Sequence, residues 1–289
     1  MLKVRGILLL GLPLAAASQA SAQSSDQSPA AAQATVTETR VITQRNGGEP
    51  DTVLMRTITA GNRTRIDVTG PGAQRAPWQT VGRTQIMIAT DSTTTTTIID
   101  SARKTYWTTD IRATMRAVQK ATGMNIKPGV NRDILTIDSL GDGGPVAGYP
   151  TLHFRRHATM RMTMNVLGQP TTWADSMVID YFVAPGLRPD SAEHAAIRKS
   201  EQLPGAAAGM LPGGASEVAA AGADAMLRMH KIGRIVETVT QSTATTDGGK
   251  MTNLRVEQFV SQRTIPASDS LFSIPEGYKK ARPGFLPTT

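Results

Sequence analysis

The most constraining feature of this sequence is a succession of short alternating segments between residues 35 and 108. Turn residues such as Asn46-Gly47-Gly48 and Gly61-Asn62 separate stretches in which apolar and polar side chains alternate. Alternation is typical of half-buried β-strands, and a short Gly- or Asn-containing gap between two of them indicates a hairpin. The run from Thr93 to Thr97 favours the same interpretation, because β-branched residues lose side-chain freedom in a helix. We therefore predict a meander of strands over 35–44, 52–59, 63–69, 84–89, 93–100 and 104–108.

Helical patterns interrupt the strands further along the chain. The sequence predicts helices over 111–122, from Asp190 to about Gln202, and over 216–231, the last ended by Gly233. Further strands are predicted over 133–137, 151–166, 172–183, 234–240 and 251–261, with a break near His157 and a turn at Asp142-Gly143-Gly144-Pro145. Many antiparallel strands interrupted by helices define an α+β fold, mainly antiparallel β.

The N-terminus indicates export. Lys3 and Arg5 precede an apolar run from Ile7 to Ala17, and Ala20-Ser21-Ala22 matches a cleavage site, so residues 1–22 are predicted to be a signal peptide. The apolar run is shorter than the roughly 20 residues of a membrane-spanning helix. The remaining divisions are a disordered leader at 23–33, a single domain at 34–282 with a helical insertion at 185–231, and a C-terminal tail at 283–289. We expect a periplasmic or secreted protein.

Composition and motifs exclude several classes of function. The chain has no cysteine, and its net charge of +8 is scattered rather than interleaved with aromatic residues, so we expect neither thiol chemistry nor specific nucleic-acid binding. We find no Gly-x-Ser-x-Gly, His-Glu-x-x-His or phosphate-loop motif, and we predict no enzyme and no cofactor. His153 and His157 would lie roughly 13 Å apart on a strand, too far to share a metal ion, so we interpret them with Arg155 as exposed polar residues. By the same alternation, Asp175 and Asp180 are expected on opposite faces.

The C-terminal segment from Asp269 to Lys280 reads Asp-Ser-Leu-Phe-Ser-Ile-Pro-Glu-Gly-Tyr-Lys-Lys and resembles the terminal motif of secreted bacterial domain-of-unknown-function family 4412. Three further elements agree: residues 63–68, residues 98–106, and Gly148-Tyr149-Pro150-Thr151 before a long strand, with Trp173 on the next. That family is similar to the LolA and LolB lipoprotein carriers. The resemblance implies a LolA-like incomplete β-barrel, a half-barrel curved around helices, with an apolar concavity that takes acyl chains.

Methionines mark the candidate binding surface. Met160, Met162 and Met164 alternate with polar residues, so in a strand they share a face with Val166, and Met177 can meet them from the next strand. Methionine is unbranched and soft, so such a face can repack around acyl chains of varied shape. The same pattern fits ordinary core beneath the helices, and one sequence does not separate these two interpretations.

The helix over 216–231 adds Met226 and Met229 to the candidate lining. It is either a lid hinged at the small-residue loop 206–214 or a helix that plugs the half-barrel. We expect an exported, non-enzymatic protein that binds a lipid, another apolar ligand or a lipid-modified partner in the concavity. The alternative is a cell-envelope structural or interaction module with a filled barrel and no ligand. A hydrolase assembled from distant residues is a third class, which a buried, charge-paired polar cluster at the barrel mouth would indicate.

Overall fold

The computed structural model describes residues 33–70, 83–89, 94–110, 125–129, 137–166, 169–188, 215–246 and 249–281. The first group of strands is β1 (Gln33–Arg45), β2 (Asp51–Ala60), β3 (Arg63–Thr69), β4 (Arg83–Ala89), β5 (Thr94–Asp100) and β6 (Thr105–Asp110). The second group is β7 (Asn125–Gly129), β8 (Ile137–Val146), β9 (Tyr149–Val166), β10 (Gln169–Ala184), β11 (Arg234–Thr246) and β12 (Gly249–Pro266). Helix α3 (Ala215–Ile232) precedes β11, and the 3-10 helix η2 (Asp269–Phe272) and the short strand β13 (Lys279–Lys280) follow β12.

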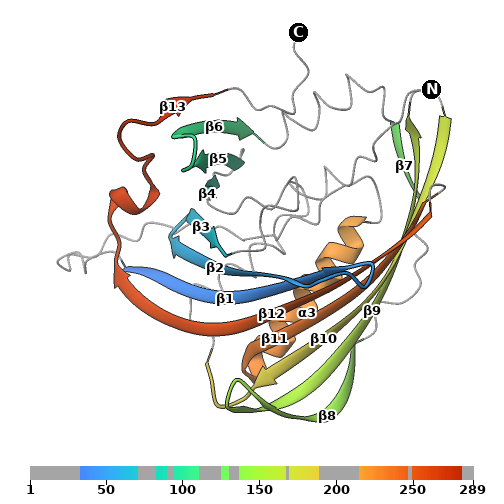
Figure 1. Ribbon diagram of the computed structural model, residues 1–289. Helices are drawn as coiled ribbons and strands as arrows, with labels where there is room; N and C mark the ends of the chain where they lie inside the picture. Colours follow the sequence, from blue (N-terminus) through green and yellow to red (C-terminus); the bar gives the residue numbers. More distant parts are fainter. Residues whose placement is uncertain are drawn as a thin grey trace, which may run out of the picture.

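The strands form one 13-stranded sheet in the order β13-β6-β5-β4-β3-β2-β1-β12-β11-β10-β9-β7, with β8 also paired to β9. All neighbours pair antiparallel except β13, which runs parallel to β6. The sheet is open and bends into a trough, with β2–β6 on one side and β9–β11 on the other (Figure 1). The predicted mainly antiparallel fold is therefore confirmed.

The predicted meander is confirmed, whereas two details of the second group are wrong. Residues 142–145 do not form a turn but lie within β8, and the chain turns at Ala147-Gly148. Positive φ angles at Gly141 and Gly144 let β8 shift its register against β9, so these glycines serve irregularities of the strand rather than a reversal. Strand β9 runs unbroken past His157, because it pairs with β10 along its length.

Strands β11 and β12 are longer than predicted, because the polar residues 243–246 continue the ladder between them. The predicted helix over 216–231 is confirmed as α3. Gln33, expected as the end of the leader, opens β1. The signal peptide, the tail and the predicted helices over 111–122 and 190–202 lie outside the described residues.

The register divides the sheet into two faces. Cross-strand pairs lead from Tyr181 of β10 through Thr238 and Glu257 to Val41 of β1, so these side chains share one face. We call it the inner face, because α3 packs on it against Tyr181. Val36 belongs to the opposite, outer face, since it lies an odd number of positions from Val41 along β1.

Helix α3 covers part of the inner face along β10 and β11. Ala225 and Met229 are 0% and 2% exposed and form a core cluster with Tyr181. The helix ends at Gly233, whose N–H donates to the carbonyl oxygen of Met229 at 3.0 Å. A Cβ atom at this position would lie 2.2 Å from the carbonyl oxygen of Ala184, so the close approach of the helix end to β10 requires glycine.

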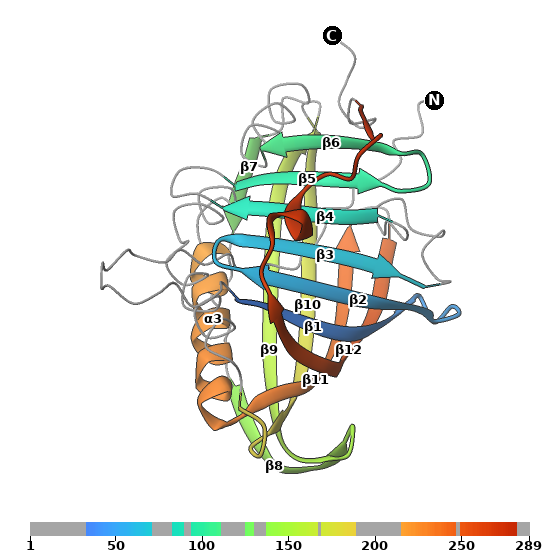
Figure 2. The same ribbon diagram turned by 90° about the vertical axis from the view of Figure 1, so that its left-hand side faces the viewer.

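The segment after β12 packs on the outer face of β3 and β4 (Figure 2). Phe272 of η2 is 7% exposed and completes a core with Val36 and Ile58, among others. The guanidinium of Arg63 lies 4.6 Å from the centre of the Phe272 ring and donates a hydrogen bond of 2.6 Å to Asp269. Cation–π and charge-assisted contacts of this kind hold η2 in place.

The rest of the terminal motif follows the edge of the sheet. The N–H of Lys279 donates to the carbonyl oxygen of Lys104 at 3.0 Å, and that of Ala281 donates to Tyr106 at 2.7 Å. Residues 63–68, 98–106 and 269–280, which carry much of the sequence resemblance, thus contact one another in the fold. Their role in this structure is to attach the C-terminal segment to the sheet.

Candidate functional site

The inner face of β9 and β10 holds the predicted methionine surface. Met177 is half-buried and lies opposite Ala158 of β9 and Ser242 of β11. The register sets Met160, Met162, Met164 and Val166 opposite Asp175, Trp173, Thr171 and Gln169. The backbone therefore aligns these positions with Met177, as the alternation predicts. The side chains of the four β9 residues lie outside the described part of the structure, so their role as ligand lining stays a prediction.

The two methionines of α3 fill the space between the helix and the sheet. Met229 is 2% exposed in the core with Tyr181, and Met226 packs against the same core while remaining partly buried. This is the packing expected of a helix that plugs the sheet. For these two side chains to line a ligand, α3 must move away from β10.

A second apolar region lies on the inner face of the other half of the sheet. We call it the β1–β3 cluster. Val41 and Val53 are 3% and 9% exposed, and Met55 and Val68 pack against them. Val41 lies opposite Val53, and Met55 lies opposite Val68, so all four side chains share the face that carries Tyr181. Apolar side chains therefore line the inner face on both sides of the bend.

Between these regions, β11 and β12 contribute a polar strip to the inner face. The register places in it Thr238, Thr240, Ser242, Arg255 and Glu257. Arg255 Nε donates to Glu257 Oε1 at 2.5 Å, so the two charges neutralise each other. The inner face is thus amphipathic, with an ion pair and hydroxyl groups between two apolar regions.

Burial raises the pKa of two inner-face groups, Asp175 and Tyr181. Burial raises the pKa of Asp175, and a hydrogen bond from the Ser176 N–H opposes this only in part. Within the described residues, the buried Oδ1 of Asp175 has no hydrogen-bond partner. Burial also raises the pKa of Tyr181, against the effect of the neighbouring Arg156. The expectation that Asp175 and Asp180 face opposite sides is confirmed, because Asp180 lies on the outer face with Arg155.

The interpretation of His153, Arg155 and His157 as exposed polar residues is wrong for His153, whose side chain is 18% exposed, whereas the Arg155 side chain is 40% exposed and His157 is exposed. The side chain of Asp180 is 8% exposed, and it accepts hydrogen bonds from His153 Nε2 at 2.7 Å and from Arg155 Nε at 2.7 Å. The His153 ring also stacks on Phe182, with centroids 4.7 Å apart. Burial alone would raise the pKa of Asp180, but the hydrogen bonds and charges of Arg155 and His153 outweigh it, and the pKa is lowered. These groups satisfy one another, which indicates a structural role.

This cluster could have been anticipated only from the pairing of β9 with β10, which sets Arg155 opposite Asp180.

Among the residues that the structure describes, no group of three or more His, Asp or Glu side chains is placed to hold a metal ion. No helix in the described ranges is long and apolar enough to cross a membrane.

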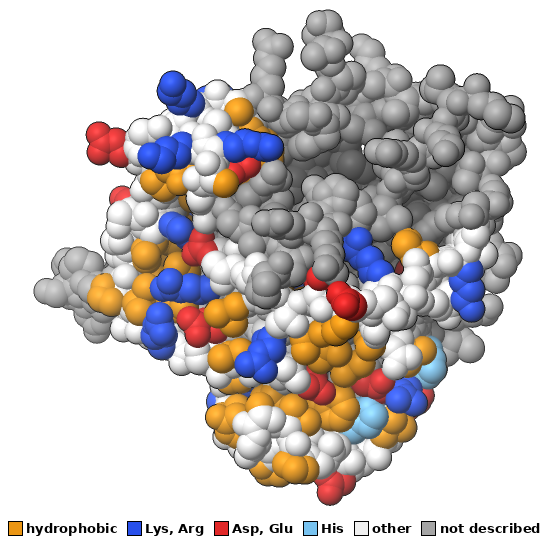
Figure 3. Space-filling view, viewed as in Figure 1, with side chains coloured by type: hydrophobic (Ala, Val, Ile, Leu, Met, Phe, Trp, Pro, Cys, Tyr) orange, Lys and Arg blue, Asp and Glu red, His pale blue; other side chains and the backbone are white. Residues whose placement is uncertain are grey.

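Hydrophobic side chains also reach the described surface. In the space-filling view they gather over the lower part of the molecule, interrupted by charged groups and histidine (Figure 3). Leu140 of β8 and Tyr149 of β9 are 47% and 36% exposed. Tyr149 adjoins the β8–β9 turn, whereas Leu140 lies further along β8, at the register shift between Ser139 and Gly141.

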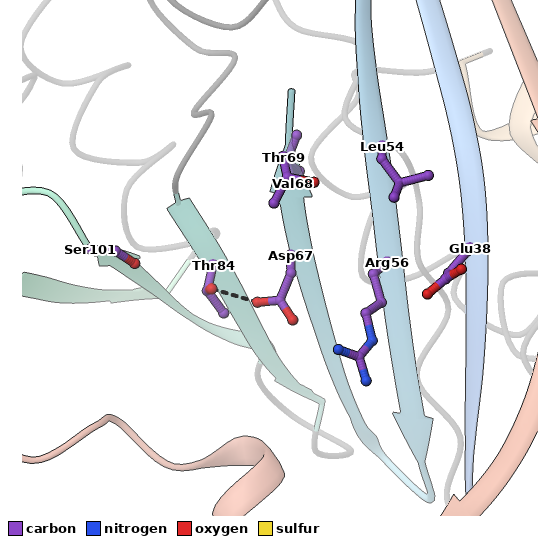
Figure 4. A pocket seen from close by; sticks show the side chains of 8 residues that line it. All are labelled: Glu38, Leu54, Arg56, Asp67, Val68, Thr69, Thr84 and Ser101. Carbon is purple, nitrogen blue, oxygen red and sulfur yellow. Dashed lines mark hydrogen bonds between the residues drawn. The ribbon is translucent and has the colours of Figure 1, made fainter. Parts of the chain in front are cut away.

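A pocket of about 400 Å³ opens on the outer face of β1–β4. It is lined by Glu38, Leu54, Arg56, Asp67, Val68, Thr69, Thr84 and Ser101 (Figure 4). Arg56 lies between Glu38 and Asp67, because the register sets it directly opposite each of them on the neighbouring strands. The pocket was not predicted from the sequence. The sequence feature that could have indicated it is the set of charged residues Glu38, Arg56 and Asp67, which are paired with one another across β1, β2 and β3.

No protein-family profile matches the chain, and no curated protein matches it. Among solved structures, the chain is similar to a LolA superfamily protein from Nitrosomonas europaea, with 7% sequence identity and a TM-score of 0.32, over 83% of this chain and 90% of that one. The sheet itself defines the class of fold, an open and mainly antiparallel sheet. Membership of family 4412 and a barrel curved around helices stay predictions.

Proposed function

We propose that the protein is exported and binds a lipid, another apolar ligand or a lipid-modified partner on the inner face of its sheet, without catalysing a reaction. The observation that carries this proposal is that apolar side chains lie on both sides of the polar strip, with the β1–β3 cluster on one side and Met177 and Ile179 of β10 on the other. An amphiphile can bury its chain against the partly buried side chains of Met55, Val68 and Met177 and place its polar group at the strip. Chain burial contributes about 0.8 kcal/mol per methylene group in transfer terms.

The side chains of this surface suit ligands of varied shape. Met55 and Met177 are both half-buried, and a thioether chain adapts to different neighbours at small cost.

Mass spectrometry tests the proposal directly. The mature protein is purified from a periplasm without detergent, and an organic extract is compared with that of a control protein exported in the same way. A stoichiometric lipid that is absent from the control is the expected result. An empty extract from folded protein contradicts it. Sequencing the N-terminus of the same sample tests export, with cleavage after Ala22 expected.

Two adjacent substitutions locate the bound ligand. Met177→Asp places a charge on the inner face, whereas Val178→Asp places the same charge one residue away on the outer face; both side chains are half-buried in β10. We expect both variants to fold, by circular dichroism, and only Met177→Asp to lose the lipid from its extract. Equal retention in the two variants contradicts binding at this face.

The second candidate is a structural or interaction module of the cell envelope. Two observations favour it: Met229 and Ala225 of α3 fill the inner face at β10, and Leu140 of β8 and Tyr149 of β9 expose apolar surface. This candidate predicts an empty extract. It also predicts that Leu140→Ser weakens cross-linking of the protein to an envelope partner while Met177→Asp does not.

A further inference from the structure

The outer-face pocket combines an arginine and two carboxylates that differ in how they are neutralised. Asp67 accepts hydrogen bonds from Arg65 Nε on both of its carboxylate oxygens at 3.0 Å, and Thr84 donates a further one. Its charge is therefore balanced within β3. The closest described partner of Glu38 is the Ser261 hydroxyl, which donates to Oε2 at 3.0 Å and carries no charge.

Among the described residues that line this pocket, Arg56 is the one cationic side chain. Its Nε is buried and, within the described part of the chain, has no hydrogen-bond partner. Figure 4 shows its guanidinium between Asp67 and Glu38, with Leu54 further along the same strand. A buried donor without an acceptor is costly, so a ligand atom that accepts from Arg56 would be favoured.

A simple anion does not match these surroundings. An anion at Arg56 would also lie near the Glu38 carboxylate, which lies opposite Arg56 on β1 and accepts a hydrogen bond from the uncharged Ser261 hydroxyl, and the repulsion would offset part of the attraction. A simple cation bound at Glu38 would in turn be repelled by the Arg56 guanidinium. The pocket therefore suits a ligand that presents a carboxylate to Arg56 and a positively charged donor to Glu38.

We propose that this pocket binds a small zwitterion of the amino-acid class, with its carboxylate on Arg56 and its ammonium group on Glu38. A guanidinium binds a carboxylate through two parallel hydrogen bonds, which fixes the orientation of the ligand. Leu54, which is 38% exposed, offers apolar contact to a ligand side chain. The pocket volume of about 400 Å³ falls within the roughly 300–1,000 Å³ usual for small-molecule sites. Arg56, Glu38 and Leu54 lie on the opposite face of the sheet from the proposed lipid surface, and Val68 is the lining residue that the pocket shares with the β1–β3 cluster.

Titration calorimetry on the full mature chain tests the proposal with three probes. L-Leucine carries both charges, isocaproate lacks the ammonium group, and isoamylamine lacks the carboxylate. We expect saturable binding of L-leucine, and affinities about tenfold lower or worse for the two other probes, because each loses one charge-assisted hydrogen bond. Isocaproate binding as tightly as L-leucine would overturn the proposal and leave a plain anion site. No saturable binding of L-leucine would overturn it altogether.

Substitutions assign the two contacts. Arg56→Gln should lower the affinity for L-leucine about tenfold or more, and Glu38→Gln should do so for L-leucine while leaving weak isocaproate binding unchanged or stronger. Arg263→Gln, at an exposed position of β12, removes the same charge outside the pocket and should leave the affinity unchanged. Circular dichroism confirms folding of each variant. Unchanged L-leucine binding by folded Arg56→Gln and Glu38→Gln proteins would overturn the assignment.

Discussion

Replacing Phe272 by alanine tests whether the C-terminal segment stabilises the whole sheet. Phe272 is 7% exposed and covers Val36 and Ile58 on the outer face. Removing a buried phenylalanine ring costs about 3–5 kcal/mol, and we take the lower end because the ring lies under a surface segment rather than in a central core. Loss of the contact with the Arg63 guanidinium adds about 0.5–1 kcal/mol. We expect Phe272→Ala to lower the free energy of unfolding by about 3.5–4 kcal/mol.

Urea denaturation of the full mature chain, followed by tryptophan fluorescence, measures this change. Ile274→Ala is the matched control, since Ile274 is in the same segment but 37% exposed, and it should cost less than about 1 kcal/mol. A loss below about 1 kcal/mol for Phe272→Ala, or equal losses in the two variants, would refute the reasoning. An unchanged urea transition with new proteolytic cleavage after β12 would show that the segment docks without supporting the sheet.

Three further predictions concern stability. Gly233→Ala should lower the free energy of unfolding by about 2–3 kcal/mol or more, because the new Cβ would meet the Ala184 carbonyl. Gly186→Ala is the control, since nothing lies within 4 Å of the Cβ added there. A similar urea midpoint for the two variants would contradict the argument. The lowered pKa of Asp180 means that its stabilisation is complete above about pH 3.9, the pKa of an unfolded aspartate, and is lost as pH falls through the folded value. Asp180→Asn should therefore make the free energy of unfolding fall less steeply as the pH drops below about 3.9. An unchanged slope in this pH range would contradict the prediction. The raised pKa of Asp175 acts in the opposite direction: above the folded pKa the ionised group destabilises the protein, so Asp175→Asn should raise the melting temperature at neutral pH but not at pH 3.

Local patterns were sufficient to predict most of the strands. The alternation in β1–β6 was readable because one face of these strands packs against apolar side chains, and the turns from β1 to β2 and from β2 to β3 contain glycine and asparagine. Glycine as a turn signal gave a wrong prediction at residues 142–145, which lie within β8. Glycines there permit positive φ inside a strand with irregular register, and a sequence does not distinguish that use of glycine from a turn.

The candidate sites depend on contacts that a local pattern does not contain. Met177 could be assigned to a face by counting along β10, because alternation is a property of one strand. The pocket around Arg56 requires the registers of two hairpins at once, and a one-residue shift in either would move Glu38 or Asp67 to the other face. The hydrogen bond between Ser261 and Glu38 joins residues 223 positions apart, which no short motif can indicate.

The position of β1 between β2 and β12 has a consequence for how this chain must fold. Gln33, at the start of β1, pairs with Pro266, at the end of β12, so the middle of the sheet is completed only after nearly all of the chain has been made. Synthesis proceeds at about 5–20 residues per second, so one edge of β1 waits roughly 10–50 s for its partner. Contacts of such high sequence separation form slowly, and a bare strand edge associates readily with other chains. Keeping the chain unfolded until β12 has emerged shortens the time for which that edge is exposed to its neighbours.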